Sequence, residues 1–331
     1  MATMYVTEQG ARIEKEYRRL LVTKEDEVLL RTPLSHVSHV VLVGRVGATT
    51  PALLTLLDAG VGLTLISRTG KLRGHLTPPV AKNIPLRHHQ YERAQDPAFC
   101  LEVARAVVGG KLRNQRTLAR RLCRSRTGVD DTLVERITAA IKGAATAEDM
   151  ATLRGLEGAG ARAHFGILRQ ALEPGWCFEK RVRRPPTDPV NALLSLAYTL
   201  LGSSLMAALE VVGLDPYDGF FHADKYGRPA LALDLVEEFR SVIADSVVLT
   251  LVNKDILEVD NFEKAAKGGV CLRQKGLRKF FQQYTARLNT KVLHPLAGRR
   301  LTYQQVFEVQ ARLMRKVIEG GIDRYRPFVA K

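Results

Sequence analysis

The chain has 331 residues, of which 46% are apolar and 25% are charged. This composition is typical of a globular protein and excludes extensive disorder, and the length favours about two domains. There are 50 Lys and Arg residues against 34 Asp and Glu residues, a net charge of +16. A surplus of this size favours a polyanionic partner, nucleic acid first and an acidic membrane second.

The cysteines and the N-terminus exclude further classes. The four cysteines lie far apart, at positions 100, 123, 177 and 271, and form no CxxC pair. A zinc ribbon or a thioredoxin-like site is therefore not supported, and reduced thiols are favoured. No signal-peptide core is visible, and no run approaches the roughly 18 apolar residues of a membrane span. We expect a cytoplasmic protein without a membrane segment.

Residues 1–76 have the pattern of a small β domain with one helix. Short runs rich in Val, Leu and Ile alternate with turn residues, and Pro51 marks the start of the helix. We predict two hairpins (4–7 with 11–13, and 17–23 with 27–31), a buried strand at 37–43, a helix over 51–58 and a third hairpin of 61–67 with 71–76.

A break in the pattern follows this domain. Prolines at 78, 79 and 85, with two histidines and Gln90 after them, predict a linker over residues 77–92. Beyond it the periodicity is helical to the end. The predicted fold class is therefore α+β: an N-terminal β domain over 1–76, followed by an all-α domain over 93–331. Its expected helices lie near 97–126, 130–143, 146–173, 189–212, 229–252, 259–267, 273–288 and 302–320.

The densest basic run lies within the first long helix. Residues 111–126 carry seven basic side chains and no acidic one. Arginine suits phosphate because its guanidinium can donate two hydrogen bonds to one group. A solvated helix face normally mixes both signs of charge, so we favour contact with nucleic-acid phosphates. The residues assigned to it are Lys111 and Arg113, Arg116, Arg120 and Arg124, the last four of which share one helical face.

Glu157 lies in an unusual setting for a carboxylate. Gly155, Gly158 and Gly160 surround it within a helical stretch, where each glycine costs about 1 kcal/mol. Close approach by another helix and close approach by a ligand both explain the glycines. Residues 158–163 also match a dinucleotide-binding pattern, but no strand precedes them, so we reject that site.

A second acidic region lies at 214–240, where a loop rich in Gly, Pro and Asp precedes a helix. Asp234 and Glu237 are three residues apart and share one helical face, and His222 lies in the loop. Carboxylates with an imidazole form a reasonable ligand set for Mg²⁺ or Mn²⁺. The ordinary alternative is a surface histidine and a solvated Glu237-Glu238 pair.

Together these segments resemble the CRISPR-associated spacer-acquisition integrases, the CRISPR-associated protein one family. The resemblance covers nearly the whole chain, and its most specific stretch is RRPPTDPVNALLS at 183–195. The other motifs are the β domain at 4–76, LTP at 76–78, PLRHHQY at 85–91, KLRNQR at 111–116, LEG at 156–158, DGFFH at 218–222 and LDLVEEFR at 233–240.

The resemblance implies a metal-dependent DNA endonuclease and integrase. Its catalytic residues and ligands for Mg²⁺ or Mn²⁺ would be Glu157, His222 and Glu237, with Asp234 a second candidate for the last acidic ligand. A DNA 3′-OH would attack a phosphodiester and insert a spacer into a CRISPR array. Tyr198 and Asn191 share a helical face and are candidates to lie beside the site, although a core tyrosine is equally compatible.

The resemblance also implies partners. These are double-stranded DNA (protospacer and repeat), a second copy of the chain in a homodimer, and a small ferredoxin-like adaptation protein. Two other readings keep the same residues. One is a metal-dependent nuclease of DNA repair, and the other is a non-catalytic DNA-binding scaffold whose basic row is its whole function.

Overall fold

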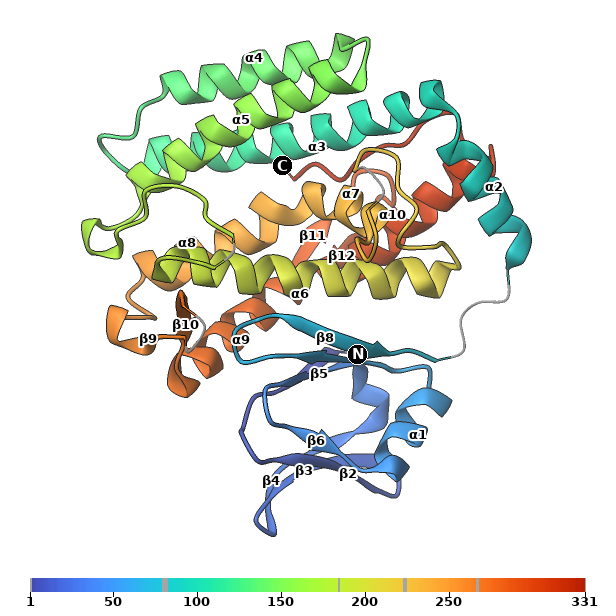
Figure 1. Cartoon of the computed structure of the whole chain (residues 1–331), viewed down its shortest axis with the longest axis vertical. Coiled ribbons are helices and arrows are strands. Elements are labelled where there is room, and N and C mark those ends of the chain that lie inside the picture. Colours follow the sequence, from blue (N-terminus) through green and yellow to red (C-terminus); the bar gives the residue numbers. More distant parts are fainter. Residues whose placement is uncertain (1, 79–82, 184, 223–224, 266–267, 331) are drawn as a thin grey trace.

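The computed structural model describes residues 2–78, 83–183, 185–222, 225–265 and 268–330. A strand-rich region forms one end of the molecule, and helices form the rest (Figure 1). This confirms the predicted order of a β-rich part followed by a helical part.

The first sheet joins four strands in the order β1-β5-β7-β8, with bounds β1 (Ala2–Val6), β5 (Val37–Val43), β7 (Gly62–Ile66) and β8 (Leu72–Leu76). β7 and β8 form the hairpin predicted for 61–76. The hairpin predicted between 4–7 and 11–13 is wrong, because β1 pairs in parallel with β5. The turn at Gly10 instead carries the chain from this sheet into the next one.

The second sheet has the order β4-β3-β2-β6, with bounds β2 (Arg12–Glu16), β3 (Arg19–Lys24), β4 (Glu27–Pro33) and β6 (Gly47–Ala48). β3 and β4 form the predicted second hairpin. A 3-10 turn (Leu34–His36) follows β4, and helix α1 (Thr50–Asp58) begins at the N-cap Thr49. Ile13, Leu20, Val40 and Leu56 pack together between the sheets and α1.

The linker is shorter than predicted. Helix α2 (Ile84–Ala94) begins inside the range 77–92, capped by the side chain of Asn83. It has only Leu86 and Gln90 buried, so its apolar periodicity is too weak to identify from sequence. Residues 79–82 of the predicted linker lie outside the described ranges.

Long helices build the remainder, in good agreement with the predicted ranges. They are α3 (Pro97–Ser125), α4 (Thr132–Thr146), α5 (Met150–Ala171), α6 (Pro189–Val212), α7 (Ala230–Phe239), α8 (Ser246–Asn253), α9 (Gln274–Leu288) and α10 (Tyr303–Ile318). Asp96, Asp149, Asp188 and Thr302 cap the N-termini of α3, α5, α6 and α10, each contributing about 1 kcal/mol. A π-helical segment (Arg240–Asp245) joins α7 to α8.

The helical part is not all-α. It contains two short hairpins, β9 (Phe262–Lys264) with β10 (Val270–Leu272), and β11 (Lys291–Leu293) with β12 (Arg300–Thr302). The helix predicted over 259–267 is therefore wrong. Residues Val259–Asn261 make a single 3-10 turn before β9, and residues 266–267 are outside the described ranges. A 3-10 turn also lies at Pro174–Trp176.

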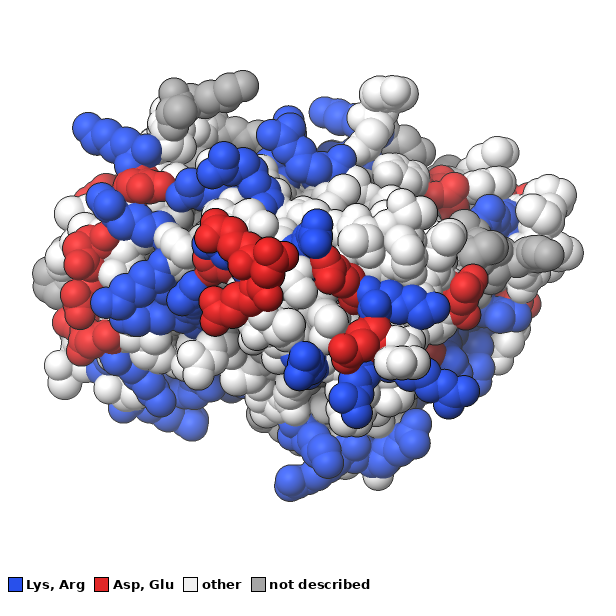
Figure 2. Space-filling model, turned by 90° about the horizontal axis from the view of Figure 1, so that it is seen from below, with Lys and Arg blue, Asp and Glu red and all other residues white. Residues whose placement is uncertain are grey.

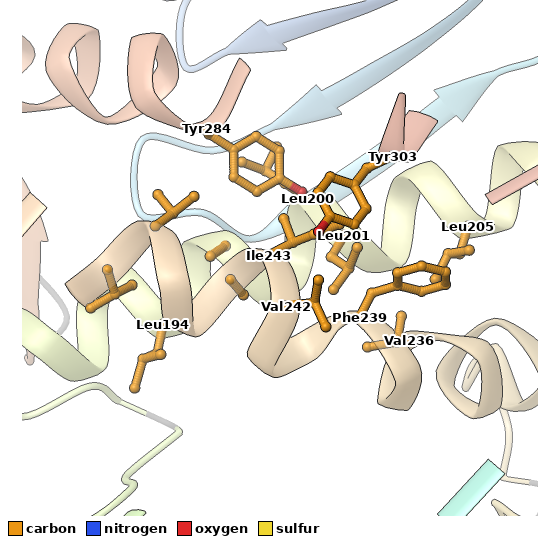
Figure 3. Packing of buried hydrophobic residues seen from close by; sticks show 14 of the residues in the cluster. Leu194, Leu200, Leu201, Leu205, Val236, Phe239, Val242, Ile243, Tyr284 and Tyr303 are labelled. Carbon is orange, nitrogen blue, oxygen red and sulfur yellow. The ribbon is translucent and has the colours of Figure 1, made fainter. Parts of the chain in front are cut away.

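Helix α6 runs through the middle of the molecule, between the other helices and the β8 side of the first sheet (Figure 1). Contrary to the expectation from sequence, it is long and apolar enough to cross a membrane by length and composition alone. Most of that stretch is buried within the protein, as expected for a core helix. In Figure 3, Leu200 and Leu201 of α6 lie beside Phe239 and Ile243, with Tyr284 and Tyr303 close by.

Candidate active site

Four side chains from different elements meet beside α3. Lys111 of α3 forms ion pairs with Glu157 of α5 and with Glu237 of α7, the latter at 2.6 Å between Nζ and Oε2. The Nε2 atom of His222, in the loop before α7, lies 3.7 Å from the other oxygen of Glu237. The three residues predicted as catalytic and metal-binding are therefore neighbours, although they are far apart in the sequence. We call Lys111, Glu157, His222 and Glu237 the carboxylate cluster.

Lys111 does not have the predicted role of an outward DNA contact. Its side chain is only 7% exposed and points between the two carboxylates. Its position on α3 explains this, because residues 111, 118 and 122 share one helical face and both Leu118 and Leu122 are buried. That spacing was the sequence signal for an inward lysine.

Asp234 holds His222 in place. Its Oδ1 accepts from the backbone N–H and from Nδ1 of His222, at 3.0 and 2.7 Å. Its Oδ2 accepts from the backbone N–H groups of Phe220 and Phe221. Since Nδ1 donates, the lone pair of Nε2 is free on the side of Glu237. With both oxygens engaged, Asp234 is a positioning residue, whereas the carboxylate of Glu237 faces Lys111 and His222.

The loop that carries His222 is fixed from two sides. Gly219 lies against the start of α7, where an added Cβ would stand 2.7 Å from backbone atoms of Ala230 and Leu231. Gln90 of α2 donates to the carbonyls of Asp215 and Asp218 and accepts from the N–H of Asp215, all at 2.8 Å. Gln90, which the sequence placed in a linker, thus supports the loop that carries His222.

Glu237 is buried but charged. Burial raises the pKa of its carboxyl, yet Arg240, Lys111 and His222 lower it by more, to about 2. Arg240, one helical turn further on, donates to Glu237 at 3.0 Å. Burial lowers the pKa of Arg240, but the negative charge of Glu237 opposes this effect, and the pKa lies above its ordinary value. The cluster is therefore a compact set of opposite charges with little water around Glu237.

Tyr198 lies one contact away from the cluster. The guanidinium of Arg240 stacks over its ring at 4.7 Å, and its hydroxyl donates to Asp245 at 2.6 Å. Burial raises its pKa well above the ordinary value. His164 of α5 bonds the other oxygen of Asp245. Tyr198 is therefore a core tyrosine that supports Arg240, and His164 has a structural role through its bond to Asp245.

Asn191 belongs to a different feature. Its side chain bonds Arg181, Asp188 and the backbone at 180 and 182, which holds the segment before α6 against that helix. Among the described residues it makes no bond to the carboxylate cluster. Its place beside the site therefore stays a prediction, and the contacts described for its amide are those to the segment before α6 and to the N-cap residue Asp188.

The alternative reading of Glu237 and Glu238 as a solvated pair is wrong, because both side chains are buried. Glu238 accepts hydrogen bonds from Tyr325, Gln310 and the backbone N–H of Phe328. Burial nevertheless raises its pKa to about 8. It fastens the segment around 325–330 beneath α7, so two adjacent glutamates serve two different purposes.

The glycines around Glu157 also separate into two kinds. A Cβ at Gly160 would overlap the side chain of Leu112, so this glycine allows α5 to pack on α3. At Gly155 nothing lies within 4 Å, and at Gly158 the nearest atom is the far end of Arg162. Helix packing explains Gly160, while a Cβ at Gly155 or Gly158 would meet no close neighbour, so packing does not require glycine at these two positions.

The predicted arginine row follows the outer side of α3. Leu112, Ala119 and Leu122 are buried, while Arg120 and Arg124 are exposed and Arg113 and Arg116 are partly exposed. On the end of the molecule that carries the N-terminal sheets, by contrast, acidic side chains lie among the basic ones (Figure 2). The unmixed run on α3 is thus a local feature of the helical part.

Two carboxylates and an imidazole meet around one ammonium on the inner side of α3, while the arginine row follows its outer side, and both features suit a phosphodiester substrate. Residues 4–286 match the family described as CRISPR associated protein Cas1. CRISPR-associated endonuclease Cas1 3 of Thermus thermophilus is 41% identical over 334 aligned residues, covering 100% of this chain and 98% of the relative. The chain belongs to the Cas1 family.

Solved structures share the fold. A casposase bound to its integration product superposes with a TM-score of 0.87 at 22% identity, covering 98% of this chain and 93% of that one. A chain of a Cas6-RT-Cas1–Cas2 complex gives 0.83 at 24% identity, covering 99% of this chain and 36% of that one. The strand-rich part followed by helices is therefore the Cas1 arrangement.

Proposed function

We propose that this protein is a metal-dependent integrase that inserts spacers into a CRISPR array. One observation carries the proposal. Glu157 and Glu237, from two helices, both contact the ammonium of Lys111, and the free Nε2 of His222 lies beside Glu237. The family named in the comparisons and the casposase fold support a DNA endonuclease or integrase. The metal and the transesterification are our proposal.

The residues present fit a divalent ion, with Lys111 standing where positive charge is required. Within the described ranges, no three His, Cys, Asp or Glu side chains are close enough to hold an ion as they stand. The ammonium of Lys111 fills the space between the carboxylates. Once it moves aside, Glu157, Glu237 and Nε2 of His222 form a hard ligand set suited to Mg²⁺ or Mn²⁺.

When bound, such an ion would stabilise the negative charge of the five-coordinate phosphorus transition state and lower the pKa of an attacking hydroxyl. The protein's own residues prepare the site for this. Asp234 sets the tautomer of His222, and Arg240 holds Glu237 charged and oriented. In the proposed step the oxygen of a DNA 3′-OH bonds to phosphorus, the P–O3′ bond of the target strand breaks, and that strand leaves with a new 3′-OH.

The surroundings suit DNA of any sequence. Arg113, Arg116, Arg120 and Arg124 would contact phosphates, which position a duplex without reading its bases. The side chain of Glu157 is 23% exposed, so a DNA strand can reach its carboxylate. The proposed DNA partners are therefore the protospacer and the repeat, and the proposed location is the cytoplasm.

We also propose a homodimer and a small ferredoxin-like partner. Val28, Leu29 and Leu30 on the edge strand β4 are 39 to 46% exposed, an apolar edge that a second copy could cover. One structural neighbour belongs to a complex that contains Cas1 and Cas2, which supports a protein partner of this kind.

A strand-joining assay tests the proposal. Purified protein, its adaptation partner and Mn²⁺ are incubated with a labelled short duplex and a supercoiled plasmid carrying CRISPR repeats. Wild type should join label to the plasmid, whereas Glu157→Ala and His222→Ala should not. Glu179→Ala is the matched control, because that side chain is 83% exposed and remote from the cluster contacts.

The products separate the remaining readings. Plasmid nicking without joined label would indicate a nuclease of repair. DNA binding without any chemistry in wild type would indicate a scaffold. Equal joining by wild type and both cluster variants would overturn the assignment of the site.

A further inference from the structure

A second group of cationic side chains lies away from the carboxylate cluster. A pocket of about 590 Å³ opens between the C-terminal half of α3, the π-helical segment, α9 and the start of α10. Its lining includes Arg120, Arg121 and Arg124 of α3 and Arg287 of α9. We call this the arginine pocket. Lys111 and Arg121 are ten residues apart on one helix, so the pocket lies about 15 Å along α3 from the cluster.

Three of the four arginines in the arginine pocket, Arg120, Arg121 and Arg124, have no counter-ion within the described ranges. Among the described residues that line it there is no carboxylate, and Arg120, Arg121 and Arg124 form no ion pair with the described part of the chain. Arg126, which follows directly after α3, does pair with Glu173 at 2.8 Å. Like charges gathered in one concavity repel one another, so an anion bound there would stabilise the arrangement.

Arg287 is held in a fixed orientation at the pocket wall. Two of its nitrogens donate to the carbonyl of Val242, at 2.8 and 2.5 Å, and its guanidinium stacks over Tyr303 at 5.0 Å. A guanidinium fixed in this way loses little entropy when a remaining N–H donates to a ligand. Figure 3 shows Val242 and Tyr303 close together in the packed core beside this wall.

A second observation points to a ligand independently of charge. Ser241 lines the pocket and is 1% exposed, yet its hydroxyl has no hydrogen-bond partner among the described residues. A buried hydroxyl without a partner is costly, and such groups mark places where a bound molecule completes the hydrogen bonding. A phosphate oxygen would accept from Ser241 and from the guanidiniums alike.

We infer that the arginine pocket binds a phosphate group of a DNA strand whose neighbouring part is held at the carboxylate cluster. The inference rests on the proposed action on DNA and adds a phosphate subsite to it. Arginine suits this ligand because its planar fork donates to two oxygens of one phosphate.

The experiment measures DNA affinity without any metal. Fluorescence anisotropy of a labelled single-stranded oligonucleotide, and of a duplex, is recorded in EDTA over a series of salt concentrations. The pocket variant is Arg121→Gln/Arg124→Gln, and the matched control is Arg18→Gln/Arg19→Gln, which removes the same charge from an exposed turn of the second sheet. Inorganic phosphate is titrated separately to test the free anion.

The pocket variant should bind at least one of the two DNA probes tenfold or more weakly than the control. The slope of log affinity against log salt should fall by about 1.4 for single strands, since each lost phosphate contact lowers it by about 0.7. Equal affinities and slopes for the two double variants would overturn the inference. A different result would point to free phosphate as the ligand instead of DNA. In that case the pocket variant alone loses phosphate binding, while its DNA affinity equals that of the control.

Ser241→Ala separates binding from structure. Its hydroxyl has no partner in the described protein, so the variant should unfold at the wild-type temperature or higher, while DNA affinity falls about fivefold. Unchanged affinity would remove Ser241 from the subsite. Strand joining is measured in parallel. If wild type binds DNA through the pocket but joins no strands, only the proposed function is contradicted. If strands are joined normally and the pocket variant binds DNA as the control does, only the pocket is contradicted.

Discussion

Lys111 is the residue whose replacement tests the carboxylate cluster most directly. The variant Lys111→Met keeps the length of the side chain and removes its ammonium. Glu237 retains Arg240 at 3.0 Å, but Glu157 loses its only ion-pair partner within the described residues. Breaking a buried pair costs about 3–5 kcal/mol. Because Glu157 is 23% exposed and water can solvate it, we expect about 2–3 kcal/mol here.

The assay is thermal unfolding with and without Mn²⁺. At about 2 °C per kcal/mol for a long chain, the variant without metal should melt about 4–6 °C below wild type. Metal at a hundred times its Kd stabilises by about 2.7 kcal/mol. In wild type part of that is offset because the ion must displace Lys111. Mn²⁺ should therefore raise the melting temperature of Lys111→Met more than that of wild type.

Lys142→Met, at an exposed position of α4, is the matched control and should behave as wild type in both conditions. The reasoning is refuted if Lys111→Met melts with wild type in the absence of metal. It is refuted equally if Mn²⁺ shifts the two proteins by the same amount, because Lys111 then does not compete for the space between the carboxylates.

Three further predictions concern the surroundings of the cluster. Asp234→Asn should weaken Mn²⁺ binding about 10–100-fold in calorimetry, because the proton on Nδ1 of His222 loses its carboxylate acceptor. Tyr325→Phe should lower the free energy of unfolding by about 1–3 kcal/mol in urea, since buried Glu238 loses a donor. Burial lowers the pKa of His39 to about 4, so its neutral form stabilises the fold fully above the unfolded pKa near 6.5. That contribution falls as the pH drops, by about 2 kcal/mol at pH 5, and His39→Gln should remove this pH dependence from urea unfolding.

Each of these predictions has a matched control. They are Asp215→Asn on the same loop, Tyr217→Phe at an exposed position and His36→Gln in the exposed turn after β4. Wild-type metal affinity for Asp234→Asn would mean that His222 is not a ligand. An unchanged denaturation midpoint for Tyr325→Phe would mean that the segment around 325–330 does not depend on Glu238. If His39→Gln and wild type lose stability in parallel below pH 6.5, another group titrates.

The sequence predicted the long helices and most strands because their signals are local. Asp96-Pro97, Asp149 and Asp188-Pro189 start helices wherever an apolar stripe follows, and the structure has helices there. The pairing of β1 with β5 depends on residues more than thirty positions apart, and the turn at Gly10 provided a local signal for a hairpin instead. Strands of three residues, such as β9, are too short to show a period.

The residues of the candidate site could be predicted from the sequence better than the way they are arranged. The resemblance indicated Glu157, His222 and Glu237, and the structure places them together. Nothing in the spacing separated Glu237 from Asp234, because both share a helical face. The hydrogen bonds of Asp234 to the loop distinguish them, and these form only when the chain folds back. Gln90 was missed because a helix with two buried residues has almost no apolar pattern.

The hydrogen bonds of Gln90 connect helix α2 to the loop that carries His222. Strand β8 ends at Leu76, and helix α2 begins soon afterwards at Ile84. Gln90 on this helix forms hydrogen bonds with the loop that ends in His222. Any shift of α2 would therefore move the backbone at 215 and 218, and with it the loop that brings His222 to Glu237. The orientation of the imidazole thus depends on a helix that contributes no side chain to the carboxylate cluster.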